Sequence, residues 1–323
     1  MGTGDYNVAA PVYVTQSGNN GKGIDHFWRR QLMYRPIKRL IKQQTWLDSL
    51  GDPLQKFVSS LFSDAGESGK DVKDLLNGTW LGHPLHPVLT DVPVGAWVCT
   101  ALMDTLAGAT GDEGLEKAAD ITLATGLLAA FGAAATGWTD WSDTYGNERT
   151  VGLAHGLTMV AAVSTYSLSL LARLTGARGL GVLLGHTGLA LVSAGAYLGG
   201  DEVFDLGYGV NHTAFIQGPG EFVPVISREE LQENAPVKAD AKGVAVVLVR
   251  QGDKVFALED TCVHAGCSLA GGKVDGESIV CPCHGSTYDL SDGSVIRGPA
   301  TMPEPHYETR VNEGMVEVRL AAE

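Results

Sequence analysis

Two short loops in the last third of the sequence bring cysteine and histidine close together. They read CVHAGC at residues 262–267 and CPCHGS at residues 281–286. In the first loop Cys262 and His264 are two positions apart, and in the second Cys281 precedes His284 by three. Two thiolates and two imidazoles could bind one zinc ion tetrahedrally. They could equally bind a two-iron cluster, with the cysteines on one iron and the histidines on the other.

The residues around these ligands favour the second chemistry. The boxes CxHxGC and CPCHGS, followed by a Gly-Pro loop at residues 297–300, resemble those of a Rieske iron–sulfur domain. The resemblance implies a [2Fe-2S] cluster whose buried iron is bound by Cys262 and Cys281. It implies that His264 and His284 bind the outer iron.

Four further residues imply which branch of the Rieske family this domain resembles. Cys267 and Cys283 match the positions that form a disulfide between the loops in the quinol-oxidising branch. Ser286 and Tyr288 match the positions of hydroxyl groups that hydrogen-bond to a bridging sulfide and to a ligand sulfur. Such donors stabilise the reduced cluster, so the resemblance implies a midpoint potential in the upper part of the family's range of roughly −150 to +300 mV.

Short β-favouring runs surround the two loops. They are FVPVI at 222, VAVVLV at 244, KVFAL at 254, SIV at 278 and MVEVRL at 315. Gly, Asp and Asn turns separate them, which predicts a compact antiparallel β domain. We assign it to residues 221–323, after a linker at 206–220, and the Rieske resemblance covers roughly 220–320.

A very hydrophobic region precedes this domain. Residues 121–139 carry no charge, and 151–172 and 179–200 each carry one histidine and no charged residue. A fourth segment, 88–110, is less clear because it contains two aspartates. All four are long enough to cross a bilayer. We therefore predict a four-helix transmembrane domain over 85–205, with a buried soluble bundle as the alternative.

Smaller features of this region indicate how the helices pack. Trp97, Trp138 and Trp141 are expected near the ends of the spans, as interface anchors. GxxxG pairs, which begin at Gly152 and Gly195, are expected to let helices approach closely.

The start of the hydrophobic region reads GHPLHP at residues 82–87, leading into DVPVGAW at 91–97. This is similar to a family of uncharacterised four-helix bacterial membrane proteins with an HPxHP signature, and the similarity would cover about 78–205. The resemblance supports four spans and implies no activity.

Ionisable residues inside membrane spans are candidates for function because burying them there is costly. His86 and His155 are predicted at similar depths and could bind one haem b axially, whereas His186 lies deeper and would need another partner. The alternative is that all three histidines form hydrogen bonds within the bundle. We expect Asp91 to cap a helix, and we assign no role to Asp104.

The N-terminal quarter has a different composition. Residues 1–22 are predicted to be disordered. Residues 23–84 contain a basic stretch from His26 to Leu50 that mixes tryptophan, leucine and isoleucine with lysine and arginine. This composition predicts a helix on an anionic membrane surface, with an ordinary solvated helix as the alternative.

An even number of spans puts both termini on the same side of the membrane. The first 84 residues contain ten Lys and Arg and no apolar run like that of a signal peptide. We therefore expect both termini and the Rieske domain on the cytoplasmic side of a bacterial plasma membrane. A disulfide is unusual in the cytoplasm, although one buried between two loops could persist there.

Composition excludes several functions. With 23 Lys and Arg against 37 Asp and Glu, the chain is too acidic for a nucleic-acid-binding protein. Five cysteines in 323 residues are too few for a disulfide-stapled miniprotein. We identify no site of two histidines and one carboxylate that would indicate an oxygenase.

The sequence predicts a membrane-anchored Rieske protein that carries single electrons in a membrane redox chain. One alternative is a self-contained oxidoreductase with haem b or quinone in the helical bundle. Another is a redox sensor or carrier subunit whose bundle is only an anchor. The sequence identifies neither the donor nor the acceptor, which could be a quinol or an electron-transfer protein.

Overall fold

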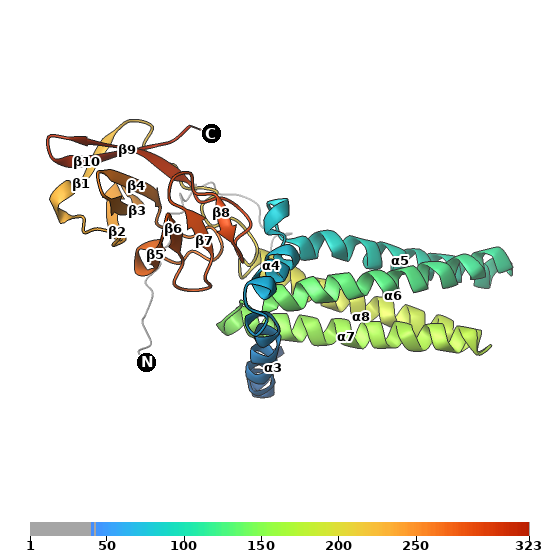
Figure 1. The fold of residues 1–323 in the computed structure, drawn as a ribbon. Helices are drawn as coiled ribbons and strands as arrows, with labels where there is room; N and C mark the ends of the chain where they lie inside the picture. The colour runs from blue at the N-terminus through green and yellow to red at the C-terminus, as the bar shows by residue number, and fades with distance from the viewer. Residues whose placement is uncertain (1–39, 42, 323) are drawn as a thin grey trace, which may run out of the picture. The chain divides into compact units, whose positions relative to one another are not determined.

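The computed structural model describes residues 40, 41 and 43–322. Every element labelled in Figure 1 belongs to one compact unit, Gln44–Glu323. The helices are α3 (Thr45–Ser63), α4 (Gly66–Asn77), η1 (Thr79–Leu81), α5 (Leu85–Thr110), α6 (Glu113–Trp141), α7 (Gly146–Leu174) and α8 (Arg178–Phe204).

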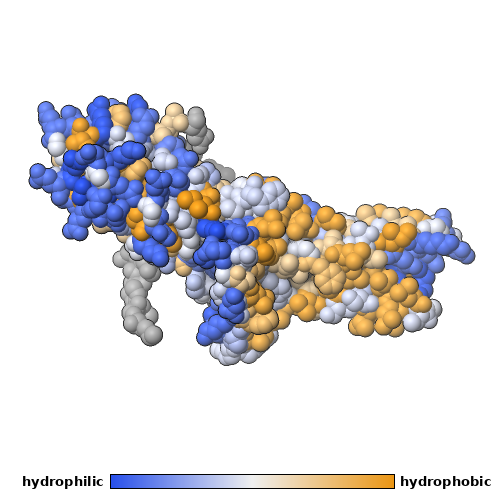
Figure 2. Space-filling view, viewed as in Figure 1, coloured by the Kyte–Doolittle hydropathy of each residue, from blue (hydrophilic) through white to orange (hydrophobic). Residues whose placement is uncertain are grey.

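Helices α5 to α8 confirm the four predicted spans. They contain 26 to 29 residues and are long and apolar enough to cross a membrane. At ~1.5 Å per residue each is about 40 Å long, which exceeds the ~30 Å of a bilayer core. Figure 2 shows hydrophobic residues over the outer surface of these helices and hydrophilic residues over the β domain.

Two large aromatic rings fill the centre of the bundle. Trp97 of α5 is fully buried and stacks on Tyr166 of α7, with ring centroids 4.3 Å apart and planes 13° apart. Glycines make room for both rings, because a Cβ atom on Gly126 or Gly188 would lie within 3 Å of them. The expectation that Trp97 lies near a span end is therefore wrong. A tryptophan can pack in the core or anchor a span at the membrane interface. Here the glycine that faces Trp97 leaves room for the ring in the core.

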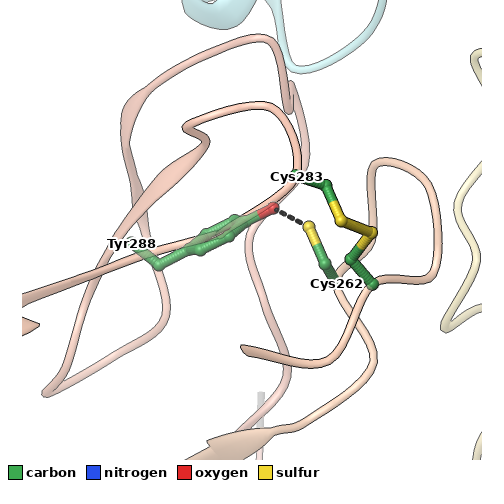
Figure 3. Close-up of a disulfide and its surroundings, with 4 residues drawn as sticks. Cys262, Cys283 and Tyr288 are labelled. Carbon is green, nitrogen blue, oxygen red and sulfur yellow. Dashed lines mark hydrogen bonds between the residues drawn. A yellow bond between two sulfur atoms is a disulfide. The ribbon is translucent and has the colours of Figure 1, made fainter. Parts of the chain in front are cut away.

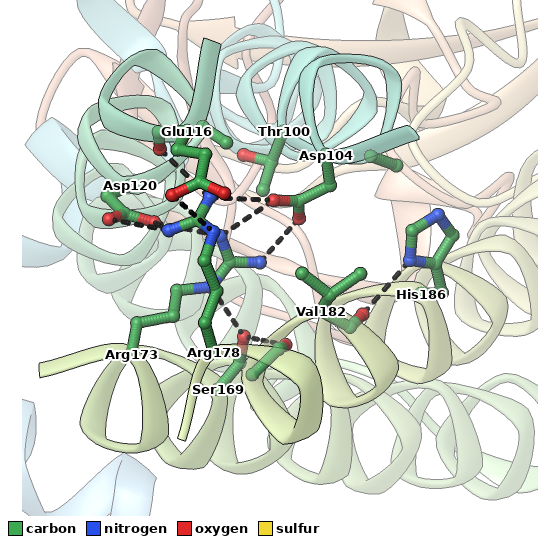
Figure 4. Close-up of polar contacts among 12 residues, drawn as sticks. Thr100, Asp104, Glu116, Asp120, Ser169, Arg173, Arg178, Val182 and His186 are labelled. Atoms are coloured by element: carbon green, nitrogen blue, oxygen red, sulfur yellow. Dashed lines mark hydrogen bonds and ion pairs between the residues drawn. The ribbon is translucent and has the colours of Figure 1, made fainter. Parts of the chain in front are cut away.

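A buried ion-pair network ties the helices together at the end of the bundle where α5 and α7 finish (Figure 4). Arg173 of α7 and Asp104 of α5 are 1% and 0% exposed in their side chains and form a two-pronged ion pair. Glu116, Asp120 and Arg178 complete the network. Each charge of this network therefore has a partner, which is the condition for burying it.

The positions where the helices begin show that a second expectation, that Asp91 caps a helix, is wrong. Helix α5 begins at Leu85, directly after Pro84, so Asp91 lies inside the helix and does not cap it. Helix α6 does have a carboxylate cap, because Asp112 accepts hydrogen bonds from the N–H groups of Gly114 and Leu115. The cap and the acidic first turn explain why α6 starts at that position.

The predicted disorder of residues 1–22 and most of the predicted basic helix lie outside the described residues. The described part continues into α3, which Figure 1 shows running across the bundle helices. Its exposed apolar side chains are Trp46, Leu50, Phe57 and Leu61. These positions fall on one helical face. That this face lies on a membrane surface stays a prediction.

The rest of the chain is an antiparallel β domain, as predicted. Its strands are β1 (Val223–Ser227), β2 (Val237–Ala241), β3 (Val244–Gln251), β4 (Lys254–Glu259), β5 (Lys273–Asp275), β6 (Ser278–Val280), β7 (Thr287–Asp289), β8 (Val295–Arg297), β9 (His306–Asn312) and β10 (Met315–Leu320). All five apolar runs singled out in the sequence are strands. The other five strands are short or more polar, and no apolar run marks them.

The strands form two sheets that carry the cysteine and histidine loops. The larger sheet has the order β1-β10-β9-β4-β3-β2, and the smaller has the order β5-β6-β7-β8. The first loop lies between β4 and β5, and the second connects β6 to β7. A core that includes Leu258, Leu269 and Ile279 packs against the loops and fixes their positions.

We predict that Gly126→Ala lowers the thermal unfolding midpoint of the detergent-solubilised protein. The new methyl group would lie 2.4 Å from the buried Trp97 indole nitrogen, and overpacking of this kind costs about 1–3 kcal/mol. Gly95→Ala, on α5 with open space around its Cβ position, is the matched control and should be neutral or stabilising. Equal midpoints for the two variants would contradict the packing described.

Candidate metal centre

The loops at 262–267 and 281–286 have the same backbone design. In each, the N–H of the first residue donates to the carbonyl of the last at 2.8 Å, and a glycine in fifth position donates back to the first residue. These glycines, Gly266 and Gly285, have φ values of +73° and +80°. Glycine adopts such left-handed angles without steric cost. The repeated turn places Cys262 and Cys281 first in their loops, and the histidine follows in third position in one loop and in fourth position in the other.

A disulfide joins the loops, as the Rieske resemblance implied. Cys267 of the first loop is bonded to Cys283 of the second, with their Cα atoms 6.5 Å apart (Figure 3). The other three cysteines are free, and of these Cys99 is exposed while Cys262 and Cys281 are buried. The disulfide cross-links the two loops and leaves the buried thiols of Cys262 and Cys281 free.

The two buried thiols lie together. A hydrogen bond between them raises the pKa of Cys262 and lowers the pKa of Cys281 to about 7. Two adjacent buried sulfurs that share a proton are arranged to bind one metal ion as thiolates.

The two histidines form a second pair. The rings of His264 and His284 have centroids 4.7 Å apart and planes 80° apart. Burial lowers the pKa of His264 to about 3 and that of His284 to about 4, so both imidazoles are neutral at pH 7. Their Nδ1 atoms are buried without a hydrogen-bond partner. Buried polar atoms rarely lack partners, and a metal ion would satisfy both.

The four groups form two pairs rather than one cluster. Among the described residues, no three His, Cys, Asp or Glu side chains are grouped as a single metal ion would require. A tetrahedral zinc site needs four ligands around one point. Two sulfurs and, separately, two imidazole nitrogens match the ligands of a two-iron cluster, so the residues present fit that group.

Two hydroxyl groups adjoin these ligands. The Tyr288 hydroxyl lies 3.1 Å from Cys262 Sγ (Figure 3). Ser286 is fully buried, and its Oγ accepts a hydrogen bond from the N–H of Ala300 at 3.0 Å. Because this bond uses a lone pair of Oγ, the hydroxyl hydrogen stays available to an acceptor in the centre.

Glu304 is a site residue that the sequence analysis missed. It is 1% exposed, and its Oε2 accepts a hydrogen bond from the N–H of Val263, between the first two predicted ligands. Burial raises the pKa of Glu304 to about 9. No local motif marks this residue, because only the fold brings it to the first loop.

The histidine edge of the centre faces the end of the helical bundle. Tyr145, between α6 and α7, lies with its ring 5.0 Å from that of His284. The Tyr208 ring, beyond α8, is 6.3 Å from that of His264, and its hydroxyl donates to the carbonyl oxygen of Asp140 at 2.7 Å. The sequence analysis did not identify these contacts.

An ionic contact holds this arrangement beside α4. Arg297 pairs with Glu67, Asp71 and Asp74 at N–O distances of 3.1, 2.5 and 2.9 Å. The N–H of Gly298 also donates to Asp74 at 2.8 Å. The loop recognised in the sequence as part of the Rieske pattern therefore also binds the helical region.

The three membrane histidines do not come together. His86 of α5 and His155 of α7 face each other with ring centroids 6.3 Å apart. His186 of α8 is elsewhere in the bundle, where its Nδ1 bonds to the carbonyl of Val182 and its Nε2 lies 3.3 Å from the Thr105 hydroxyl.

The fold and the site define a two-sheet iron–sulfur domain attached to a four-helix membrane bundle. The family model described as "Rieske [2Fe-2S] domain" matches residues 221–313. "Ferredoxin CarAc" of Metapseudomonas resinovorans is 35% identical over 98 residues, which are 30% of this chain and 92% of that protein. The chain belongs to the Rieske [2Fe-2S] family through this domain, and a Rieske domain implies a [2Fe-2S] cluster.

Further relatives include subunits of membrane complexes. The "Cytochrome bc1 complex Rieske iron-sulfur subunit" of Streptomyces lividans is 40% identical over 65 residues, covering 20% of this chain and 38% of that one. Among solved structures, the ferredoxin of carbazole 1,9a-dioxygenase from Nocardioides aromaticivorans IC177 is 29% identical. It covers 31% of this chain and 98% of its own, with a TM-score of 0.30.

The membrane bundle matches a separate family. Residues 82–212 match the family model described as "Predicted membrane protein (DUF2231)". This match includes all four spans and supports a membrane anchor for the Rieske domain.

We predict that Tyr288→Phe lowers the midpoint potential of the cluster by about 40 mV. The hydroxyl is expected to stabilise the reduced cluster through its hydrogen bond to Cys262. A net hydrogen bond is worth about 1 kcal/mol, and the potential of a one-electron couple shifts by about 59 mV for each tenfold change in the equilibrium constant. Thr287→Val, which removes a hydroxyl bonded to the Gly285 carbonyl, is the control and should leave the potential unchanged. A redox titration followed by EPR measures both, and equal potentials in Tyr288→Phe and the wild type would contradict the assignment.

We also predict that Glu304→Gln makes the domain less sensitive to alkaline pH. The folded protein keeps the Glu304 proton between the ordinary pKa of 4.5 and the raised value of about 9. Stability therefore falls as the pH rises through that window, by up to about 1.4 kcal/mol per pH unit. Thermal unfolding of both proteins at pH 6 and pH 8 is the measurement. The variant should gain stability relative to the wild type at pH 8, and a pH-independent difference would overturn this account.

Proposed function

We propose that this protein is a membrane-anchored Rieske protein that carries one electron at a time in a membrane redox chain. Cys262 and Cys281 would hold the inner iron of its [2Fe-2S] cluster, and His264 and His284 the outer iron. The cluster, when bound, supplies a one-electron couple. The single observation that carries this proposal is the pair of buried, unpartnered histidine nitrogens beside two paired thiols.

Three features support a high midpoint potential. The Cys267–Cys283 disulfide is present, and the hydroxyls of Ser286 and Tyr288 adjoin the ligands. Hydroxyl donors favour the reduced, more negative cluster. The relatives include both ferredoxins and subunits of cytochrome complexes, so overall similarity does not select a potential class. The residues beside the cluster favour the upper part of the roughly −150 to +300 mV range.

The position of the histidine edge supports a partner that acts at the membrane. The rings of Tyr145 and Tyr208, at the end of the candidate spans, lie 5.0 Å from that of His284 and 6.3 Å from that of His264, the two proposed ligands of the outer iron. A quinol or a membrane-bound electron-transfer protein would reach that edge where the bundle ends. We propose a bacterial plasma membrane location, and the cytoplasmic side stays a prediction.

One observation favours a second candidate function, a self-contained membrane oxidoreductase with a cofactor in the bundle. His86 and His155 come from different helices and face each other within the membrane domain. A redox group between them would make the bundle an electron-transfer partner of the cluster.

We predict that the detergent-purified full-length chain, reduced with dithionite, gives the EPR signal of a Rieske cluster with a midpoint above about −100 mV. Cys281→Ala should abolish the signal, because it removes a ligand of the inner iron. Cys99→Ala, which removes an exposed cysteine on α5, is the matched control and should retain it. A midpoint below about −100 mV would contradict the high-potential assignment. A wild-type preparation with two bound irons but no Rieske signal would overturn the proposed function.

A further inference from the structure

The four-helix bundle is built from two equivalent helical hairpins. Residues of α5 correspond to residues of α7 at a constant spacing of 69 positions, and those of α6 to α8 at a spacing of 62. The pairs in α5 and α7 are His86 with His155, Trp97 with Tyr166, and Asp104 with Arg173. The pairs in α6 and α8 are Gly126 with Gly188, Ala133 with Gly195, and Gly137 with Gly199.

In each of these pairs, the residue of α5 lies next to the equivalent residue of α7. The aromatic rings stack at 4.3 Å, the charged groups form a buried ion pair, and the imidazoles face each other at 6.3 Å. Both hairpins run in the same direction, since α5 and α7 are separated by a single returning helix. An approximate twofold axis therefore runs along the bundle between α5 and α7, and it passes between the two histidines.

The two histidines have equivalent surroundings. The Nδ1 of His86 bonds to the carbonyl of Ala133, and the Nδ1 of His155 bonds to the carbonyl of Gly195, both at 2.8 Å. Each ring also packs on a glycine of the helix whose carbonyl it bonds to. His86 packs on Gly137 of α6, and His155 packs on Gly199 of α8.

These hydrogen bonds fix the tautomer of both rings. A carbonyl oxygen only accepts, so each Nδ1 carries the hydrogen and each Nε2 keeps its lone pair. Among the described residues, no hydrogen bond reaches either Nε2. Metal-binding histidines have this arrangement, in which the nitrogen that does not bind the metal donates to a carbonyl.

The spacing of the rings fits one metal ion between them. A metal–nitrogen distance of ~2.0 Å and ~1.1 Å from nitrogen to ring centre place two axial imidazoles about 6 Å apart. The observed centroid distance is 6.3 Å with planes 85° apart, compared with 4.7 Å for the rings of His264 and His284. The distance between the His86 and His155 rings suits two ligands on opposite sides of one metal atom, whereas the shorter distance between His264 and His284 suits two ligands on the same side of one iron.

The number of ligands selects the kind of metal group. Two imidazoles alone are too few for a protein-bound ion, and no third His, Cys, Asp or Glu of the described chain joins them. Haem needs only two axial ligands, because its porphyrin supplies four nitrogens. The sequence contains no CxxCH motif for covalent attachment. We propose that His86 and His155 are the axial ligands of one b-type haem on the pseudo-twofold axis of the bundle.

This site lies at the end of the bundle that meets the Rieske domain. Gly137, beneath His86, is three residues before Asp140, which is about one helical turn. The Asp140 carbonyl accepts the hydrogen bond of Tyr208, whose ring faces His264. The haem site itself is independent of the proposed function. Electron exchange between the haem and the cluster rests on the proposed function. One electron leaving the reduced cluster would convert ferric to ferrous haem, with no bond made or broken.

The test is the haem content of the full-length protein, expressed with the haem precursor δ-aminolevulinic acid and purified in detergent. A pyridine haemochrome assay should find one haem b per chain, with the optical and EPR spectra of low-spin, bis-histidine iron. His86→Ala and His155→Ala should each lower the haem content about tenfold or more. His155→Met should retain haem with an altered spectrum, because methionine can also serve as an axial ligand.

The chain offers a matched control in His186→Ala. His186 lies in α8, its Nδ1 bonds within its own helix, and the equivalent position in α6 is Ala124. This variant should keep its haem. The Rieske EPR signal, recorded for every variant, shows whether the chain has folded.

Two results overturn the haem site. One is wild-type protein with a full cluster signal and no haem, which leaves the proposed function intact. The other is an equal loss of haem in His186→Ala and His86→Ala. The converse result, haem without any cluster signal, would overturn the proposed function and leave this site standing.

Discussion

The Nδ1 atoms of His264 and His284 are buried, and no group of the described protein satisfies them. An unsatisfied buried nitrogen costs about 1–3 kcal/mol, so a metal bound by both nitrogens would stabilise the two loops. The rest of the domain supports that one requirement. The sheets position the loops, the disulfide cross-links them, and Glu304 holds the backbone between Cys262 and His264.

The constraint in the membrane region is that buried polar groups cannot hydrogen-bond to water. Polar groups in a bilayer are costly without partners inside the protein, and the bundle places several of its charged and ring-bearing side chains opposite an equivalent residue across the twofold axis. Asp104 faces Arg173, and Trp97 faces Tyr166. His86 and His155 stand out because each satisfies one nitrogen with a backbone carbonyl, while their ring centroids lie 6.3 Å apart.

The contact between the two regions connects these constraints. Arg297 is bound by three acidic side chains of α4, and its neighbour Gly298 donates to Asp74. Tyr145 and Tyr208 then cover the histidine edge of the cluster site. In this arrangement the edge expected to exchange electrons lies against the membrane domain, so a partner must either approach along the bundle end or belong to the bundle itself.

The sequence by itself determined the features encoded by local pattern. Four long apolar runs gave four helices, five apolar runs gave five strands, and the spacing of the loop cysteines and histidines predicted the metal centre, because each signal lies within a few consecutive residues. Only the tertiary structure placed Glu304 beside Val263 and Trp97 in the core, and only it brought the rings of His86 and His155, whose similar depth the sequence predicted, to a centroid distance of 6.3 Å. Those contacts join residues more than 40 positions apart, and which helical face meets which neighbour depends on packing across the bundle, which no local pattern specifies.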